Sequence, residues 1–155
     1  MNRDEFADFY SASFPRVSAA VRAFCGDTEV AQEATQEAFA RAYSRWHRLK
    51  ETSWAYGWVT TTALNLSKRH FRQRARRPAP GGATSSPGPT SDRLDLLAAL
   101  RSLPERQRQA IVLHYLMDCR VATVADLMGL SEGTVKAHLH RARATLHDLL
   151  EVRNA

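Results

Sequence analysis

The sequence has few cysteines and no long apolar run, and both scarcities narrow the class of protein. Its 155 residues include two cysteines, Cys25 and Cys119, whose small number and wide separation exclude a disulfide framework. No stretch approaches the roughly 18 consecutive apolar residues that a membrane-spanning helix requires. The first residues lack the charged and then apolar pattern of a secretory signal. We therefore expect a cytoplasmic protein with no membrane insertion.

Patterns that would support catalysis are also missing. His138 and His140 are two residues apart on an expected helix, so their side chains point about 200° apart and cannot share a metal ion. The adjacent glycines Gly81 and Gly82 lie in a stretch rich in Pro and Ser and do not form a phosphate-binding loop. No Ser/His/Asp or Cys/His set has a spacing that supports nucleophilic catalysis. We expect no enzyme activity, no catalytic residue, no metal and no cofactor.

Acidic residues are absent from the segment in which basic residues are most concentrated. The whole chain carries 22 Lys and Arg against 16 Asp and Glu, a net charge of +6. The acid-free segment 65–77 contains six cations: Lys68, Arg69, Arg72, Arg74, Arg76 and Arg77. Such a run attracts phosphates through counterion release, which makes nucleic acid the first partner to consider. A solvated helix end is the alternative that charge alone leaves open.

One segment has no side chain large enough to pack. Residues 78–91 are only Pro, Gly, Ser, Thr and Ala, so burial cannot offset the entropy of ordering them. We predict a flexible linker over residues 78–92 between two small domains, residues 1–77 and 93–155. We also expect the two domains to move semi-independently in the free protein.

Apolar residues recur at helical spacing in both domains, and no stretch alternates as a strand would, so we predict an all-α fold. In the first domain we expect Pro15 to begin the second helix, Gly26 to end it and Asp27 to cap the third. The four helices expected there cover about residues 6–14, 15–25, 28–47 and 54–77.

The second domain has the pattern of a helix-turn-helix. Helices are expected over 93–103 and from Pro104 onward, followed by a short helix that a capping box at Thr123 begins and Gly129 ends. Ser131 is expected to cap the last helix. Its buried stripe consists of Val135, Leu139, Ala142 and Leu146.

The opposite side of this last helix carries Lys136, Ala137, His140 and Arg141, with no acidic residue between positions 133 and 147. Small and basic side chains on one face suit insertion into a DNA groove. An ordinary pair of helices with a solvated face is the alternative.

These segments match a known family in order along the chain. Residues 124–143 strongly resemble the region 4.2 helix-turn-helix of extracytoplasmic-function (ECF) bacterial sigma factors, and residues 103–108 resemble region 4.1. Residues 36–43 are similar to the region 2.2 helix, and residues 58–65 with the basic run resemble regions 2.3–2.4. The resemblance implies a four-helix region 2-like domain and a region 4-like helix-turn-helix domain.

The resemblance also implies a function and its residues. Sigma factors bind the β′ coiled coil and β flap of core RNA polymerase, direct it to the −10 and −35 elements of promoter DNA and melt that DNA. The residues that match −35 positions are Lys136, Ala137, His140 and Arg141 as base readers, with Arg106, Arg108 and Arg143 at phosphates. Those that match −10 positions are Trp54, Tyr56, Asn65, Lys68, Arg69 and Arg72. Those that match the polymerase-binding face are Glu33, Gln36 and Glu37.

A stand-alone helix-turn-helix regulator that binds duplex operator DNA as a dimer is the alternative function. It would require the first domain to serve dimerisation or effector binding. Association with core polymerase distinguishes the two functions. The sequence leaves open whether an anti-sigma factor is a further partner and which promoters are recognised.

Overall fold

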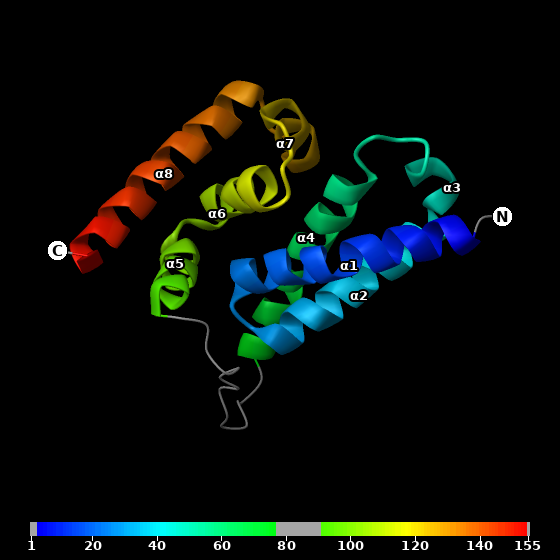
Figure 1. Cartoon of the computed structure of the whole chain (residues 1–155), viewed down its shortest axis with the longest axis horizontal. Coiled ribbons are helices and arrows are strands. Elements are labelled where there is room, and N and C mark those ends of the chain that lie inside the picture. Colours follow the sequence, from blue (N-terminus) through cyan, green and yellow to red (C-terminus); the bar gives the residue numbers. More distant parts are fainter. Residues whose placement is uncertain (1–2, 77–90, 155) are drawn as a thin grey trace.

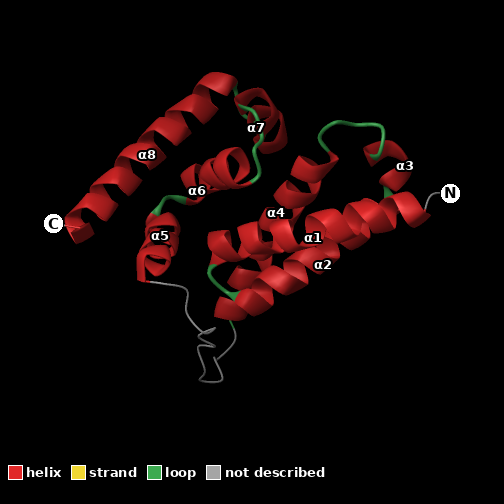
Figure 2. Cartoon of the chain, viewed as in Figure 1, coloured by secondary structure: helices red, strands yellow, loops and turns green. Residues whose placement is uncertain are grey.

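The computed structural model describes residues 3–76 and 91–154, and within these ranges it contains helices and no strands (Figure 1, Figure 2). The all-α prediction is confirmed. Residues 78–90 of the expected linker lie outside the described residues, and its last two residues, Ser91 and Asp92, belong to a helix. Among the described residues, no helix is long and apolar enough to cross a membrane, and no group of three or more His, Cys, Asp and Glu could hold a metal ion.

The first domain is a bundle in which α4 (Ala55–Ala75) packs against α1 (Arg3–Cys25) and α2 (Thr28–Ser44). A single turn, α3 (Trp46–Leu49), follows α2 and precedes the loop to α4. Small side chains let these helices approach closely, and four alanines are fully buried: Ala34, Ala38, Ala42 and Ala63. Larger buried side chains fill the rest of the core: Val17, Val21, Phe24, Phe39 and Leu64.

Helix α1 continues through Pro15, so the predicted helix boundary at this residue is wrong. A proline inside a helix removes a backbone hydrogen bond and costs about 3 kcal/mol. Packing on both sides of Pro15 offsets that cost. Before it, the rings of Tyr10 and Phe14 lie 5.1 and 5.5 Å from the ring of Phe39 on α2. After it, Val17 is fully buried, while Pro15 itself is exposed.

The turn between α1 and α2 follows the prediction. Gly26 has a φ of 75°, the left-handed conformation that commonly ends a helix. Asp27 caps α2, since its Oδ1 accepts a hydrogen bond from the backbone N–H of Val30 at 3.0 Å. Helix α2 ends at Ser44, earlier than the predicted residue 47, and the N–H of Arg45 turns back to the carbonyl of Ala42.

The second domain comprises α5 (Ser91–Ser102), α6 (Glu105–Ile111), the π-helical turn η1 (Val112–Leu116), α7 (Val121–Met128) and α8 (Glu132–Asn154). Helices α7 and α8 form the predicted helix-turn-helix. Gly129 ends α7 with a φ of 68°, and the Oγ of Ser131 accepts from the backbone N–H of Thr134 at 3.1 Å. The predicted stripe on α8 is buried at Val135, Leu139 and Ala142.

The capping box predicted at Thr123 is wrong. Helix α7 begins two residues earlier, at Val121, and Arg120 precedes it without a side-chain cap. The chain turns toward α7 at Asp118, which has a φ of 55°. Burial of Val124 against the rest of the domain favours a register that leaves Thr123 inside the helix.

The two domains contact each other in the structure. Helix α1 contacts α5 and η1, and α4 contacts α7 and η1. The composition of the linker carries no information about complementary surfaces on the domains, so these contacts were not predicted. The semi-independent motion of the domains in the free protein stays a prediction. We call this contact of α1 and α4 with α5, α6, η1 and α7 the interdomain interface.

We predict that Asp27→Ala lowers the free energy of unfolding by about 1 kcal/mol, because the N–H of Val30 loses its acceptor. The other carboxylate oxygen of Asp27 accepts from Arg74 of α4 at 3.0 Å. Asp27→Asn separates the two roles, since asparagine caps about as well as aspartate but carries no charge. Chemical denaturation should place the Asn variant near wild type. Equal destabilisation by both variants would assign the effect to the ion pair.

Candidate nucleic-acid interface

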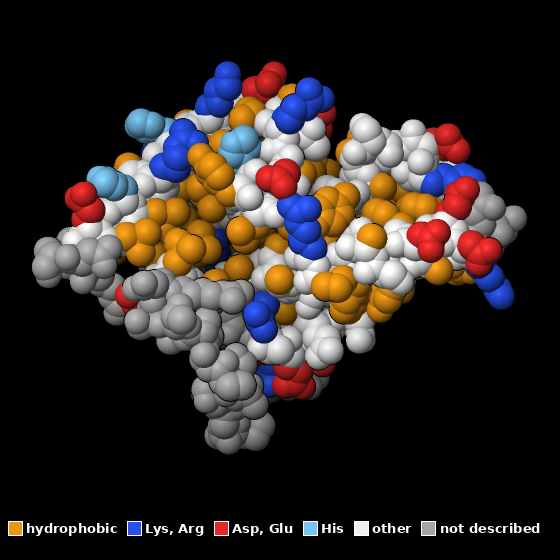
Figure 3. All heavy atoms as spheres, in the orientation of Figure 1, with side chains coloured by type: hydrophobic (Ala, Val, Ile, Leu, Met, Phe, Trp, Pro, Cys, Tyr) orange, Lys and Arg blue, Asp and Glu red, His pale blue; other side chains and the backbone are white. Residues whose placement is uncertain are grey.

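Helix α8 presents the residues that the sequence predicts as base readers. Lys136, His140 and Arg141 are exposed and Ala137 is half-buried, on the side opposite the buried stripe. Residues 133–147 contain no acid, although Glu132 lies one turn before Lys136 at the start of α8. Figure 3 shows Lys and Arg side chains at the end of the second domain where α7 meets α8. The structure thus brings all four residues together.

The three arginines predicted at phosphates differ in their freedom to bind one. Arg106 is exposed. Arg143 is also exposed, although its Nη1 donates to the hydroxyl of Tyr115 at 2.7 Å. Arg108 is half-buried in the interdomain interface, where its Nη1 donates to the carbonyl of Phe24 at 2.7 Å and its guanidinium lies 4.8 Å from that ring. Arg108 is therefore engaged within the protein in this conformation.

The outer face of α4 carries most of the predicted −10 residues. Trp54 stands at the N-terminal end of α4 and is 45% exposed. Asn65, Arg69 and Arg72 are exposed along one side of the helix, at spacings of four and three residues. An exposed aromatic ring at one end of a helix, with cations further along it, is a combination that suits unpaired nucleic acid through stacking and charge.

Tyr56 and Lys68 are the two predicted −10 residues that are engaged within the protein. The guanidinium of Arg16, on α1 of the same domain, lies 5.5 Å from the centre of the Tyr56 ring. Lys68 makes its contacts across the interdomain interface. The Nζ of Lys68 donates to the Oε1 of Gln109 on α6 at 2.6 Å and lies 3.9 Å from a carboxylate oxygen of Glu105. Burial lowers the pKa of Lys68 even though Glu105 opposes that shift. Neither side chain is free for DNA here.

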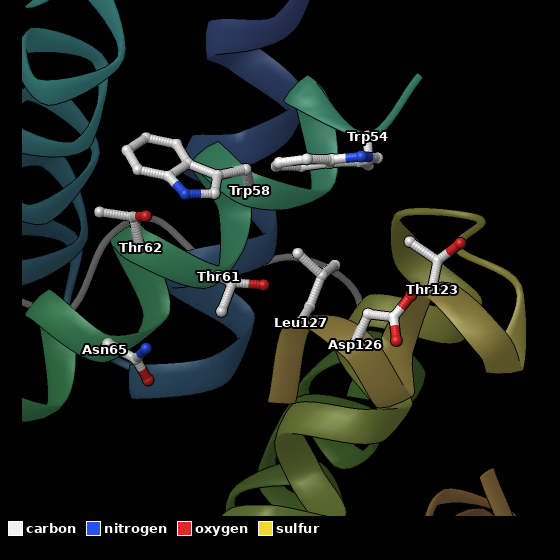
Figure 4. Close-up of a pocket in the computed structure, with 8 residues that line it drawn as sticks. All are labelled: Trp54, Trp58, Thr61, Thr62, Asn65, Thr123, Asp126 and Leu127. Carbon is white, nitrogen blue, oxygen red and sulfur yellow. The ribbon is translucent and has the colours of Figure 1, made fainter. Parts of the chain in front are cut away.

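A cavity of about 490 Å³ lies between the outer face of α4 and helix α7 (Figure 4). The residues that line it from the first domain are Trp54, Trp58, Thr61, Thr62 and Asn65, and those from α7 are Thr123, Asp126 and Leu127. Figure 4 shows Leu127 pointing from α7 toward Thr61, with both tryptophans at one end of the cavity. Two of the predicted −10 residues therefore face the second domain.

The predicted polymerase-facing residues lie together on α2. Glu33 and Gln36 are exposed. Glu37 is half-buried, and its carboxylate accepts hydrogen bonds from His70 of α4 and from Arg41, each at 3.1 Å. Burial by itself raises the pKa of Glu37, but the hydrogen bonds from His70 and Arg41 outweigh it, so the pKa lies below its ordinary value. Glu37 thus also ties α2 to α4.

Several residues of this surface escaped prediction from the sequence. Thr61 and Thr62 line the cavity, and Arg45 holds the half-buried Trp58 with its guanidinium 5.6 Å from the indole ring. The spacing of residues 58, 61, 62 and 65 is helical and could have indicated a shared face. No such signal exists for Arg16, because its partner Asp118 is 102 residues away in the chain.

Comparison with known proteins identifies both domains. Residues 9–77 match the family Sigma-70 region 2, and residues 93–146 match the family Sigma-70, region 4. Together these stretches contain every candidate site residue described above.

Individual relatives agree with these matches. The ECF RNA polymerase sigma factor SigL of Mycobacterium tuberculosis is 30% identical over 139 residues, which cover 80% of this chain and 78% of SigL. The probable RNA polymerase sigma factor RfaY of Xanthomonas campestris is 30% identical over 149 residues, which cover 86% of this chain but 37% of that longer protein.

A solved structure shares the fold. The sigma factor RpoE from Bartonella quintana, in complex with the anti-sigma factor NepR, superposes with a TM-score of 0.77 at 23% identity. The superposition covers 96% of this chain and 98% of that chain. Region 2 and region 4 thus follow each other in the sequence, with relatives that cover most of the chain. The chain belongs to the ECF family of RNA polymerase sigma factors.

Proposed function

We propose that this chain binds core RNA polymerase, reads the −35 element with α8 and captures the unpaired strand of the −10 element on the outer face of α4. The observation that carries the proposal is the presence in one chain of two separate surfaces whose side chains suit nucleic acid. The helix-turn-helix suits duplex DNA, whereas an exposed tryptophan at the start of α4, with cations further along the helix, suits a single strand. A regulator that binds only duplex operator DNA has no use for the second surface.

The assignment of α8 follows from its donors. Lys136 and Arg141 can donate to the O6 and N7 of guanine, and they lie in the first turns of the helix, which come nearest to the bases. Ala137 permits a close approach, and His140 lies beside both donors. We assign the phosphates to Arg106, Arg108 and Arg143, which position the domain without reading sequence.

The assignment of α4 follows from the energetics of strand opening. Unpairing bases costs free energy that stacking on aromatic rings and contact with cations can offset. Trp54 and Tyr56 would supply the rings and Asn65 would face the same strand. Lys68, Arg69 and Arg72 would follow its phosphates.

We assign the partners of the remaining surfaces by the same reasoning. Glu33, Gln36 and Glu37 would contact the β′ coiled coil of the polymerase, and the second domain would reach the β flap. The Bartonella sigma factor is bound to an anti-sigma factor, and we propose a partner of that class here as well. Sigma factors are in general not catalytic, and we assign this chain no catalytic residue. Its proposed place of action is the cytoplasm, on chromosomal DNA.

Association with core polymerase tests the proposed function directly. Wild type should co-elute with the core enzyme in gel filtration, and Glu33→Lys should raise the dissociation constant about tenfold by placing a wrong charge in the contact. Asp148→Lys makes the same charge change on the exposed side of α8 and should leave the affinity unchanged. Wild-type protein that elutes apart from the core enzyme would contradict the proposal.

Replacing the exposed tryptophan tests strand capture. Trp54→Ala should reduce open-complex formation more than closed-complex binding, because stacking is worth about 1–3 kcal/mol per base. A template with a premelted −10 bubble should restore much of the activity. The control is Phe71→Ala, which removes an aromatic ring of 51% exposure from another side of α4. If the bubble restores nothing, Trp54 does not act in melting.

Selection of −35 sequences can distinguish the residues of α8 that read bases from those that bind phosphates. Lys136→Ala or Arg141→Ala should relax preference at one −35 position, since a base-edge donor is worth about 1–3 kcal/mol of discrimination. Arg143→Ala should weaken all promoters in parallel and lower the salt slope of binding by about one. Active −35 variants selected from a randomised library report both effects. Identical motifs for wild type and all three variants would mean that this face contacts only phosphates.

A further inference from the structure

A widened helical turn carries Tyr115 out of the core of the second domain. The turn η1 continues α6, which packs against α8 (Figure 1). In an α-helix the residues three and four positions after the fully buried Val112 would share its face. These residues are Tyr115 and Leu116, yet they are 49% and 40% exposed, and Met117, the next in the chain, is buried instead. The π-helical geometry of η1 therefore directs the Tyr115 ring outward, and such turns are frequent at functional sites.

The exposed ring contacts an arginine of α8. The Nη1 of Arg143 donates to the hydroxyl oxygen of Tyr115 at 2.7 Å. Both residues belong to the second domain, so this hydrogen bond does not depend on how the two domains contact each other. Water competes for both exposed partners, and the bond adds little to the stability of the fold. Its main effect is to hold the guanidinium in one place.

His114 fixes the orientation of the Tyr115 ring. The two rings meet edge to face, with their centroids 4.7 Å apart and their planes at 78°. The Nδ1 of the half-buried His114 lies 2.8 Å from the carbonyl oxygen of Cys119, and it carries the hydrogen because a carbonyl can only accept. The backbone thus holds the imidazole, the imidazole packs against the phenol, and the phenol hydroxyl holds Arg143.

The pair of Tyr115 and Arg143 offers two kinds of donor side by side. A phenolic oxygen that accepts from Arg143 keeps its own hydrogen for a further acceptor, and the guanidinium keeps its remaining N–H groups. Hydrogen bonds from an ionised donor to a phosphate are of the stronger kind. Asp118, three residues after Tyr115, does not neutralise this charge, since it is paired with Arg16 at 2.6 Å. Such a pair of donors suits the oxygens of one phosphate.

Arg143 lies on the side of α8 that carries the proposed base readers. It follows Lys136 by seven residues, so the two side chains project within about 20° of each other and lie about 10 Å apart along the helix axis. The first turns of an inserted helix meet the base edges. A donor two turns further along the same side is placed for the phosphates at the edge of the groove.

We propose that Tyr115 and Arg143 together form a binding site for one phosphate of duplex DNA, in which Tyr115 holds the guanidinium and donates its own hydroxyl hydrogen to the same phosphate. This inference rests on the proposed function, which assigns Arg143 to a phosphate, and it adds Tyr115 to that contact. The site positions the second domain on DNA and reads no sequence. Because Arg143 is held before DNA arrives, less side-chain freedom is lost on binding.

The test measures the affinity of the full chain for a fluorescein-labelled duplex of mixed sequence by fluorescence anisotropy at low salt. Tyr115→Phe removes the hydroxyl and keeps the ring that contacts His114. It should raise the dissociation constant about tenfold, because the hydroxyl bonds both to Arg143 and to the phosphate. Tyr10→Phe is the matched control, since it removes the hydroxyl of a 39% exposed tyrosine on α1. The control should bind as wild type does.

The salt dependence of binding distinguishes positioning from a general loss of structure. Arg143→Ala should lower the salt slope by about one, because one phosphate contact is lost. Tyr115→Phe removes no charge, yet it should lower the slope as well, since the released guanidinium no longer stays at its phosphate. A variant that binds more weakly with the slope of wild type would contradict the proposed role of Tyr115.

A double-mutant cycle tests whether the two residues act as one site. Added to Arg143→Ala, the change Tyr115→Phe should cost less than about twofold in affinity, because the site is already broken. Losses that simply multiply would overturn the proposal. So would a Tyr115→Phe variant that matches the Tyr10→Phe control, or a wild-type chain that binds no duplex.

None of these measurements contains polymerase, so they can be compared with the co-elution experiment. If the expected losses are found but the chain does not co-elute with the core enzyme, only the proposed binding of polymerase is refuted. If the chain co-elutes but Tyr115→Phe has no effect on duplex binding, only this inference is refuted.

Discussion

The inner face of α4 packs on α1 and α2 through small side chains, and this packing fixes where the outer face of the same helix points. Ala34, Ala38 and Ala63 are fully buried at this contact, so a larger side chain at any of them would move the whole helix. This packing of the opposite side of α4 positions the row Trp58, Thr61 and Asn65. The hydrogen bond between His70 and Glu37 adds a polar contact between α4 and α2 at the edge of the core. The proposed capture of a strand thus depends on the core of the first domain.

The local features of the fold could be predicted from the sequence, because they arise from short-range chemistry. Gly129 and Ser131 end and begin helices through their own conformational and hydrogen-bonding preferences, whatever the rest of the chain does. The helix starts predicted at Pro15 and Thr123 were wrong for the same reason. Their local preference was outweighed by the packing of Phe14 against Phe39 and by the burial of Val124, both of which depend on residues distant in sequence. The periodicity of apolar residues predicted that these segments are helical. Where each helix begins and ends depends on packing.

In the candidate site, too, local features could be predicted from the sequence and long-range contacts could not. The faces of α8 and α4 follow from helical spacing and from the lack of acids, so Lys136 and Arg69 could be placed on exposed surfaces from the sequence alone. The engagement of Lys68 and Arg108 across the interdomain interface could not be foreseen, because no periodicity relates Lys68 to Gln109 or Arg108 to Phe24. The Lys and Arg side chains that can donate to phosphates can also donate to carbonyl and carboxylate oxygens.

Transcription by core polymerase with and without this chain, on fragmented genomic DNA and with transcript 5′ ends sequenced, tests the central claim most directly. A sigma factor with these two surfaces must create starts that are absent with the core enzyme alone. The account predicts that these starts share two motifs, upstream of the start and at a constant spacing, because one chain presents both reading surfaces. A set of start sites unchanged by addition of the chain would contradict it.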